Sequence, residues 1–241
     1  MREAQTRLYL SQRSVGKPVS EPQVDTLQGE LDVRKRNLVK EMKKGSPTPE
    51  LLTRYWQAVY DADGKKAEFS VVVPPCDWSE KQLETLTAQG GRLVFVPDEL
   101  TMPDGLGILQ RMYPELGNFT MRDGMLITQE RSGGGWIGVE SDIDAPLRNS
   151  SDDAAREIYG FLGLQGQRLS TYIIASLDSW RLTGDLFDYR TESRLIDSRC
   201  GEKYAYASFP DNDRNFLRIN LAMPGDSYPY VGTRSEESRP E

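Results

Sequence analysis

Residues 169–221 constrain the fold most strongly, because they hold the clearest periodic signals in this chain of 241 residues. Residues 169–183 place apolar side chains at helical spacing and are followed by a glycine, which is typical of a core helix. Residues 203–209 and 214–221 alternate between apolar and polar side chains, as the two strands of a β-hairpin do. The stretch therefore predicts a core helix followed by an antiparallel pair of strands.

A second supersecondary unit is predicted between residues 69 and 96. The β-branched run at residues 69–73 and the apolar run at residues 92–96 are both typical of buried strands. Residues 79–89 lie between them, and Ser79 and Gln82 have the spacing of a helix capping box. A strand, a helix and a strand over so short a stretch predict a right-handed crossover with parallel strands.

The N-terminal part predicts a pair of helices. Apolar residues recur at helical spacing over residues 23–44, and Thr48 with Pro49 is a typical start for a second helix. The polar side of the first helix is rich in Lys and Arg, so the pair could be a docking arm for an acidic partner or a helical cap with a solvated charged face.

The whole chain predicts an α/β or α+β fold with a mixed sheet. We expect a helical extension at residues 1–66, of which residues 1–20 are a loose lead-in, and an α/β domain at residues 67–225. Residues 226–241 are charged and poor in apolar side chains, so they are expected to form a disordered tail. Three further elements are expected, namely helices near residues 104–113 and 150–162 and a hairpin around Asp123 and Gly124.

The chain has no histidine and two cysteines, which excludes several kinds of site. Catalysis by Ser-His-Asp or Cys-His groups is excluded, and so is zinc held by histidine. No apolar run is long enough to cross a bilayer, and the first ten residues lack the apolar stretch of a signal peptide. We therefore expect a cytoplasmic protein with reduced thiols and no membrane partner.

Charge is distributed unevenly along the chain. Residues 1–66 carry 13 Lys and Arg against 9 Asp and Glu, whereas residues 67–158 carry 7 against 16. The net charge of −7 and the acidic middle argue against binding of polyanions by the whole surface, although a local basic site remains compatible with them.

One candidate metal site lies in residues 136–144, which alternate as a strand would. On such a strand Glu140, Asp142 and Asp144 would share one face. Oxygen ligands of this kind bind Mg²⁺ or Mn²⁺. The alternative is a charged face in contact with solvent, and no cofactor is required under that interpretation.

One candidate ligand surface lies in the C-terminal half. Arginines in the connector before the predicted hairpin would share a face if the connector were helical, and the hairpin places further arginines opposite its buried leucines. The tyrosines on the partner strand join that face only in one register. The ligand-binding candidates are Arg190, Arg194, Arg199, Tyr204, Tyr206, Arg214 and Arg218.

Two outcomes remain open for this surface. Single-stranded nucleic acids stack on aromatic rings that are interleaved with guanidinium groups. Alternatively the tyrosines lie in the core and the arginines pair with acids, since residues 165–220 contain 8 Lys and Arg and 8 Asp and Glu.

Several segments, mostly from the C-terminal half, resemble hypothetical proteins from candidate-phyla bacterial genomes. They include residues 166–176, 193–195 and 232–236, together with residues 136–140 and 143–146. The resemblance implies a bacterial cytosolic protein, and it implies no activity and no site residues.

Three functions are compatible with these observations. The first is a binding protein that recognises an anionic ligand, a nucleic acid or a protein through the arginine and tyrosine surface. The second is a metal-dependent phosphoester or nucleotide enzyme, in which Arg190, Arg194 or Arg199 would stabilise phosphate charge. The third is a purely structural subunit. The sequence leaves the oligomeric state open, and it favours the first function.

Overall fold

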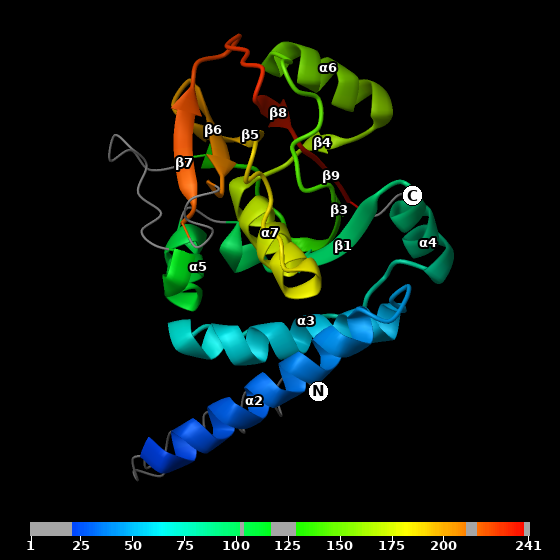
Figure 1. Cartoon of the computed structure of the whole chain (residues 1–241), viewed down its shortest axis with the longest axis vertical. Helices are drawn as coiled ribbons and strands as arrows, with labels where there is room; N and C mark the ends of the chain where they lie inside the picture. Colours follow the sequence, from blue (N-terminus) through cyan, green and yellow to red (C-terminus); the bar gives the residue numbers. More distant parts are fainter. Residues whose placement is uncertain (1–20, 102–103, 117–128, 211–215, 239–241) are drawn as a thin grey trace.

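The computed structural model describes residues 21–101, 104–116, 129–210 and 216–238 (Figure 1). The predicted lead-in and the predicted hairpin around Asp123 lie outside these ranges. The α-helices in the described ranges are α2 (Glu21–Met42), α3 (Pro49–Gly64), α4 (Glu80–Ala88), α5 (Gly105–Met112), α6 (Asp152–Leu162) and α7 (Leu169–Thr183). The strands are β1 (Gly91–Val96), β2 (Gln129–Glu130), β3 (Gly135–Glu140), β4 (Gln165–Gly166), β5 (Glu192–Cys200), β6 (Lys203–Ser208), β7 (Arg218–Ala222), β8 (Val231–Thr233) and β9 (Ser235–Glu237).

The strands form two sheets. The first sheet has the order β1-β3-β9-β4, and all of its pairs are antiparallel. The second sheet has the order β2-β5-β6-β7, with antiparallel pairs, and β8 adds to β5 as a parallel neighbour. The expected α+β class is therefore confirmed, and so is the C-terminal hairpin, which is formed by β6 and β7.

The helix α7 is the centre of the core, as its periodicity predicts. Figure 1 shows α7 in the middle of the molecule with α2 and α3 below it in the view. Tyr172, Ile173 and Leu177 of α7 are buried in one cluster with apolar residues of both sheets. Tyr55 and Trp56 of α3 belong to the same cluster. The expected boundary at residue 66 therefore does not separate two cores.

Local signals placed the helix ends correctly. The Oγ1 atom of Thr48 accepts a hydrogen bond from the backbone N–H of Leu51 at the start of α3, with Pro49 in the first turn. At the start of α4, Ser79 and Gln82 form the predicted capping box. Each cap satisfies backbone N–H groups that have no partner within the helix.

The predicted parallel crossover is wrong. Residues 69–73 form no strand, and β1 pairs with β3 in antiparallel register. The side chain of Gln57 on α3 takes the place of a neighbouring strand, because its amide donates to the carbonyl of Val71 at 3.1 Å and accepts from the N–H of Val73 at 2.9 Å. The run is therefore bound along a helix, and it is not buried as a whole, because Val73 is buried whereas Val72 is 73% exposed.

The predicted disordered tail is also wrong for residues 226–238. The segment from β8 to β9 contributes one strand to each sheet, and Arg234 between these strands is fully buried. Its Nη2 atom lies 3.0 Å from Oδ1 of Asp188, which is also fully buried. The charged composition predicts disorder, but the charges of Arg234 and Glu236 are neutralised by partners that are distant in sequence.

No helix in the described ranges is long and apolar enough to cross a membrane, which agrees with the hydropathy of the sequence.

Candidate functional site

The strands β5, β6 and β7 carry five of the predicted ligand residues: Arg194, Arg199, Tyr204, Tyr206 and Arg218. Their register places Arg194 opposite Tyr206 and Tyr206 opposite Asn220, and it places Ser208 opposite Arg218. Directly opposed residues of an antiparallel sheet point to the same side. Tyr206 and Arg218 therefore share the outer face with Arg194, which is the register that the sequence left open.

The helix α6 covers one end of this outer face. Tyr204 is only 7% exposed, and it packs against Ile196 and against Tyr159 of α6. Arg194 is fully buried, and its Nη1 atom lies 2.7 Å from a carboxylate oxygen of Asp152 at the start of α6. The prediction that Arg194 and Tyr204 contact a ligand therefore does not hold, because both side chains are buried in the protein.

The other predicted arginines do not converge on one place. The guanidinium carbon of Arg199 lies 4.5 Å from the centroid of the Tyr204 ring. That of Arg190 lies 4.7 Å from the centroid of the Tyr189 ring. The connector is not helical, because β5 begins at Glu192, so Arg190 and Arg194 do not share a helix face. Arg214 lies outside the described residues. Of the predicted ligand residues, Tyr206 and Arg218 are the ones that the structure brings together in an open groove.

This groove, called the sheet groove below, has a volume of about 480 Å³. Its lining side chains combine aromatic rings with polar groups: Glu192, Tyr206, Phe216, Arg218, Asn220 and Tyr230. The ring of Tyr230 is 53% exposed and stacks on the ring of Tyr228 at a centroid distance of 5.8 Å. An exposed ring supported by a second ring is a pre-formed stacking surface.

Four aromatic or polar residues of the sheet groove are not among the predicted ligand residues: Glu192, Phe216, Asn220 and Tyr230. Tyr230 belongs to the segment at residues 226–241 for which the composition predicts disorder. Tyr230 reaches the groove because β8, which begins one residue later, pairs with the start of β5 at Glu192. No local pattern around Tyr230 indicates this parallel pairing, because its partner strand lies far away in the sequence.

The polar groups of the sheet groove can act as both donors and acceptors. Burial raises the pKa of Glu192 above its ordinary value, although Arg218 and a hydrogen bond from Ser208 act in the opposite direction. Burial also raises the pKa of Tyr206, whose hydroxyl is a hydrogen-bond donor and acceptor at neutral pH. Together with the amide of Asn220, these groups can form hydrogen bonds to a flat polar ligand.

The predicted metal site is not assembled. The strand β3 ends at Glu140, so Asp142 and Asp144 lie in the loop that follows it and not on an alternating face. The carboxylate of Glu140 accepts hydrogen bonds from the N–H and the hydroxyl of Ser235, both at 3.1 Å. Within the described ranges no three Asp, Glu, Cys or His side chains are grouped so that they could hold a metal ion.

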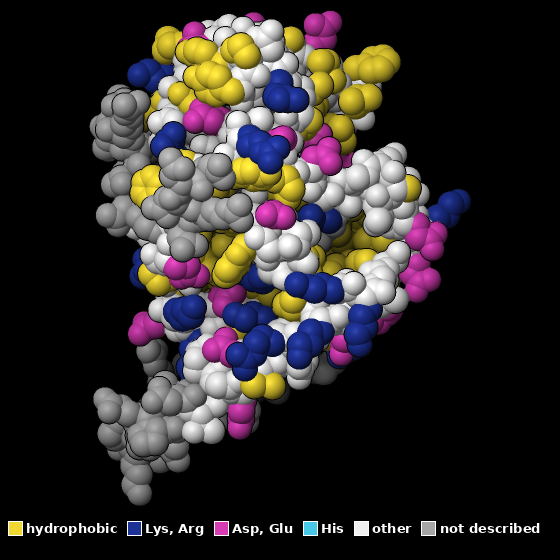
Figure 2. All heavy atoms as spheres, viewed as in Figure 1, with side chains coloured by type: hydrophobic (Ala, Val, Ile, Leu, Met, Phe, Trp, Pro, Cys, Tyr) yellow, Lys and Arg dark blue, Asp and Glu magenta, His cyan; other side chains and the backbone are white. Residues whose placement is uncertain are grey.

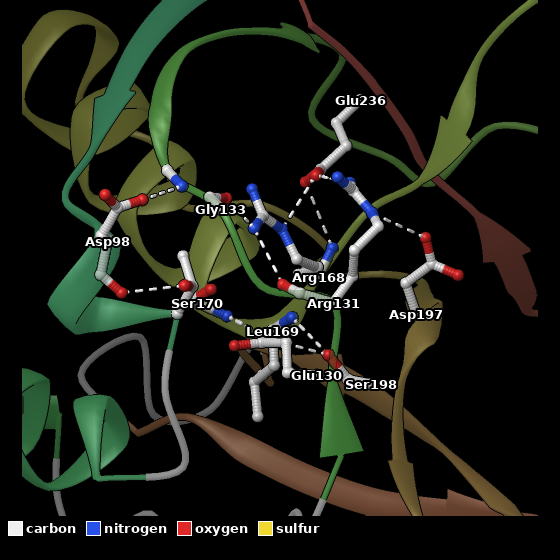
Figure 3. Close-up of polar contacts among 12 residues, drawn as sticks. Asp98, Glu130, Arg131, Gly133, Arg168, Leu169, Ser170, Asp197, Ser198 and Glu236 are labelled. Carbon is white, nitrogen blue, oxygen red and sulfur yellow. Dashed lines mark hydrogen bonds and ion pairs between the residues drawn. The ribbon is translucent and has the colours of Figure 1, made fainter.

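The buried N-terminus of α7 is already occupied by protein groups (Figure 3). The N–H of Leu169 donates to Oγ of Ser198 at 2.8 Å, and the N–H of Ser170 donates to Oε1 of Glu130 at 3.0 Å. The guanidinium of Arg168 donates to the carbonyl of Gly133 in the glycine-rich loop before β3. The loop and the helix end therefore bind each other, and the carboxylate of Glu130 occupies the place where a phosphate would bind.

Comparisons of the chain with models of known protein families, with curated proteins and with solved structures each found no match.

Proposed function

We propose that the protein binds single-stranded nucleic acid, and that unpaired bases stack in the sheet groove. The observation that carries the proposal is the lining of this groove, where the rings of Tyr206, Phe216 and Tyr230 lie together with Arg218 and Asn220. Bases that are not paired expose their flat faces and their edges, and aromatic rings on a sheet surface are the usual partners of those faces.

The polar residues of the groove fit the other parts of a nucleotide. The guanidinium of Arg218 is exposed and suits a phosphate oxygen. The amide of Asn220 and the carboxyl of Glu192 suit the donors and acceptors along a base edge. Paired bases in a duplex cannot reach these groups, so the proposal implies a preference for single strands over double strands.

Removing the rings of the sheet groove is expected to weaken binding strongly. Base stacking on an aromatic side chain contributes about 1–3 kcal/mol per base, so Tyr230→Ala should raise the Kd for a labelled single strand by about tenfold. Tyr206→Ala should have an effect of the same order. The measurement is fluorescence anisotropy with single-stranded RNA and DNA at low salt.

The control for these variants is Phe161→Ala, which removes a ring that is 91% exposed on α6 and lies outside the sheet groove. Its Kd should equal that of the unchanged protein, and thermal melts should show that all variants are folded. A strand of the same length without bases should bind much more weakly than the complete strand. Equal binding of the two strands, or no binding of either at low salt, would refute the proposal.

A further inference from the structure

We propose that a second groove, formed by α2 and α7, binds the phosphates of the same strand, so that the ligand is a polynucleotide rather than a mononucleotide. This inference rests on the proposed function and extends it. The sheet groove contains one arginine and one carboxylate, so charge in that groove does little to hold a polyanion. A strand of several nucleotides needs further cations along its path.

The second groove, called the basic groove below, has a volume of about 380 Å³ and lies between the two helices. Lys35, Arg36 and Lys40 of α2 line one side of it together with Lys43, which lies in the turn after α2. Trp180 and Arg181 of α7 line the other side. Figure 2 shows the Lys and Arg side chains gathered over the N-terminal helices in the lower half of the view.

Two of these cations are already neutralised at the bottom of the groove. Lys35 lies 2.5 Å and Arg181 lies 3.0 Å from the two carboxylate oxygens of Asp63. The Nη2 atom of Arg181 also donates to the hydroxyl of Tyr113 at 2.7 Å. This buried network holds α2, α3 and α7 together, and it fixes the positions from which the remaining cations project.

The other three cations are available to a ligand. Arg36, Lys40 and Lys43 are exposed, and none of them forms an ion pair within the described residues. Their spacing of four and three residues brings Arg36 and Lys40 of α2 and Lys43 of the following turn to one side. One carboxylate of the lining, that of Glu115, is exposed near them. The groove therefore keeps an excess of positive charge that faces solvent, although the chain as a whole is acidic.

An aromatic ring lies on the opposite side of the basic groove. Trp180 is in the last turn of α7 and is 49% exposed, although most of α7 is buried. A half-exposed indole next to unpaired cations provides a flat surface for a base whose phosphate contacts α2. An acidic protein segment would use the cations but has no need of the ring, so we favour nucleic acid.

The two grooves are neighbours in the fold. The N–H of Leu217 donates to the carbonyl of Leu116 at 3.2 Å. Glu115 lines the basic groove, and Phe216 and Arg218 line the sheet groove, so residues of both grooves directly flank this hydrogen bond. The proposed path of the strand from one groove to the other runs along this connection.

The test compares a dinucleotide with a single strand of about 12 nucleotides, a length within the usual range of such sites. The double variant Lys40→Gln/Lys43→Gln is expected to weaken binding of the long strand about tenfold and to leave binding of the dinucleotide unchanged. The slope of log Kd against log salt should fall by about 1.4, because each lost phosphate contact of a single strand accounts for about 0.7.

The control Lys81→Gln/Arg148→Gln removes two exposed charges outside both grooves. It should change neither the Kd for the long strand nor the slope of log Kd against log salt. If Lys40→Gln/Lys43→Gln leaves the long strand unaffected while Tyr230→Ala weakens it, the inference is overturned and the proposed function stands. If Tyr206→Ala and Tyr230→Ala change the binding of neither the dinucleotide nor the long strand, the proposed function fails. The inference that one strand occupies both grooves then fails with it. Competition by polyglutamate as strong as by unlabelled strand would overturn the inference in favour of an acidic protein partner.

Discussion

Replacing Asp188 by alanine is expected to lower the free energy of unfolding by about 3–5 kcal/mol, because it leaves a buried charge without its partner. Asp188 and Arg234 are both fully buried. The carboxylate of Asp188 also accepts hydrogen bonds from the hydroxyls of Thr191 and Ser193, at 2.7 and 2.5 Å. Chemical denaturation of the purified variant, followed by circular dichroism, measures the loss.

A double-mutant cycle separates the contribution of the Asp188–Arg234 ion pair from the effect of lost packing. Arg234→Met keeps most of the side-chain volume, and the double variant Asp188→Ala/Arg234→Met removes both charges. We expect the double variant to be less destabilised than the sum of the two single variants. The exposed pair of Arg54 and Glu41 is a control, since Arg54→Ala should cost less than about 1 kcal/mol. A loss below that value for Asp188→Ala would contradict the buried pairing.

Replacing Glu236 by alanine is expected to have an effect of the same size. Glu236 is 2% exposed, and its Oε1 atom lies 2.9 Å from Nε of Arg168, which is fully buried. The same oxygen also accepts a hydrogen bond from Arg131 (Figure 3). Without Glu236 the guanidinium of Arg168 keeps its charge in the core, which should cost about 3–5 kcal/mol.

The adjacent residue supplies a matched control. Glu237 has the same side chain and also lies in β9, but no cation pairs with it in the described part of the chain. Glu237→Ala should change the free energy of unfolding by about 0.5 kcal/mol or less. If the two alanine variants unfold at the same denaturant concentration, the network around Arg168 does not stabilise the C-terminal segment as described.

The sequence predicted the features of the fold that depend on neighbouring residues. The caps at Thr48 and Ser79 satisfy N–H groups within three residues, so their patterns sufficed. The strand predicted at residues 69–73 failed because a β-branched run indicates extended backbone and does not show whether its hydrogen-bond partner is a strand or a side chain. The tail failed because Arg234 and Glu236 pair with Asp188 and Arg168, and composition does not record partners at such distances.

In the candidate site, too, the features set by neighbouring residues were predicted and those set by distant partners were not. Alternation along β7 was enough to predict that Arg218 faces away from the buried leucines. The side on which Tyr206 lies stayed open, because it depends on the register between β6 and β7. The burial of Arg194 depends on Asp152 in α6, and the contribution of Tyr230 depends on the parallel pairing of β8, which no local pattern indicates. The carboxylates at residues 140–144 failed as a metal site because β3 ends before their alternation does.

The most direct test of the account is photo-crosslinking of a bromouracil-substituted single strand, followed by mass spectrometry of the crosslinked peptides. Bromouracil reacts with aromatic rings that it stacks on, so the account predicts adducts on Tyr206, Phe216 or Tyr230. Adducts on Trp180 should accompany them when the strand is long enough to reach the basic groove. A strand that crosslinks only to residues outside the two grooves, or that does not crosslink at all, would contradict the account.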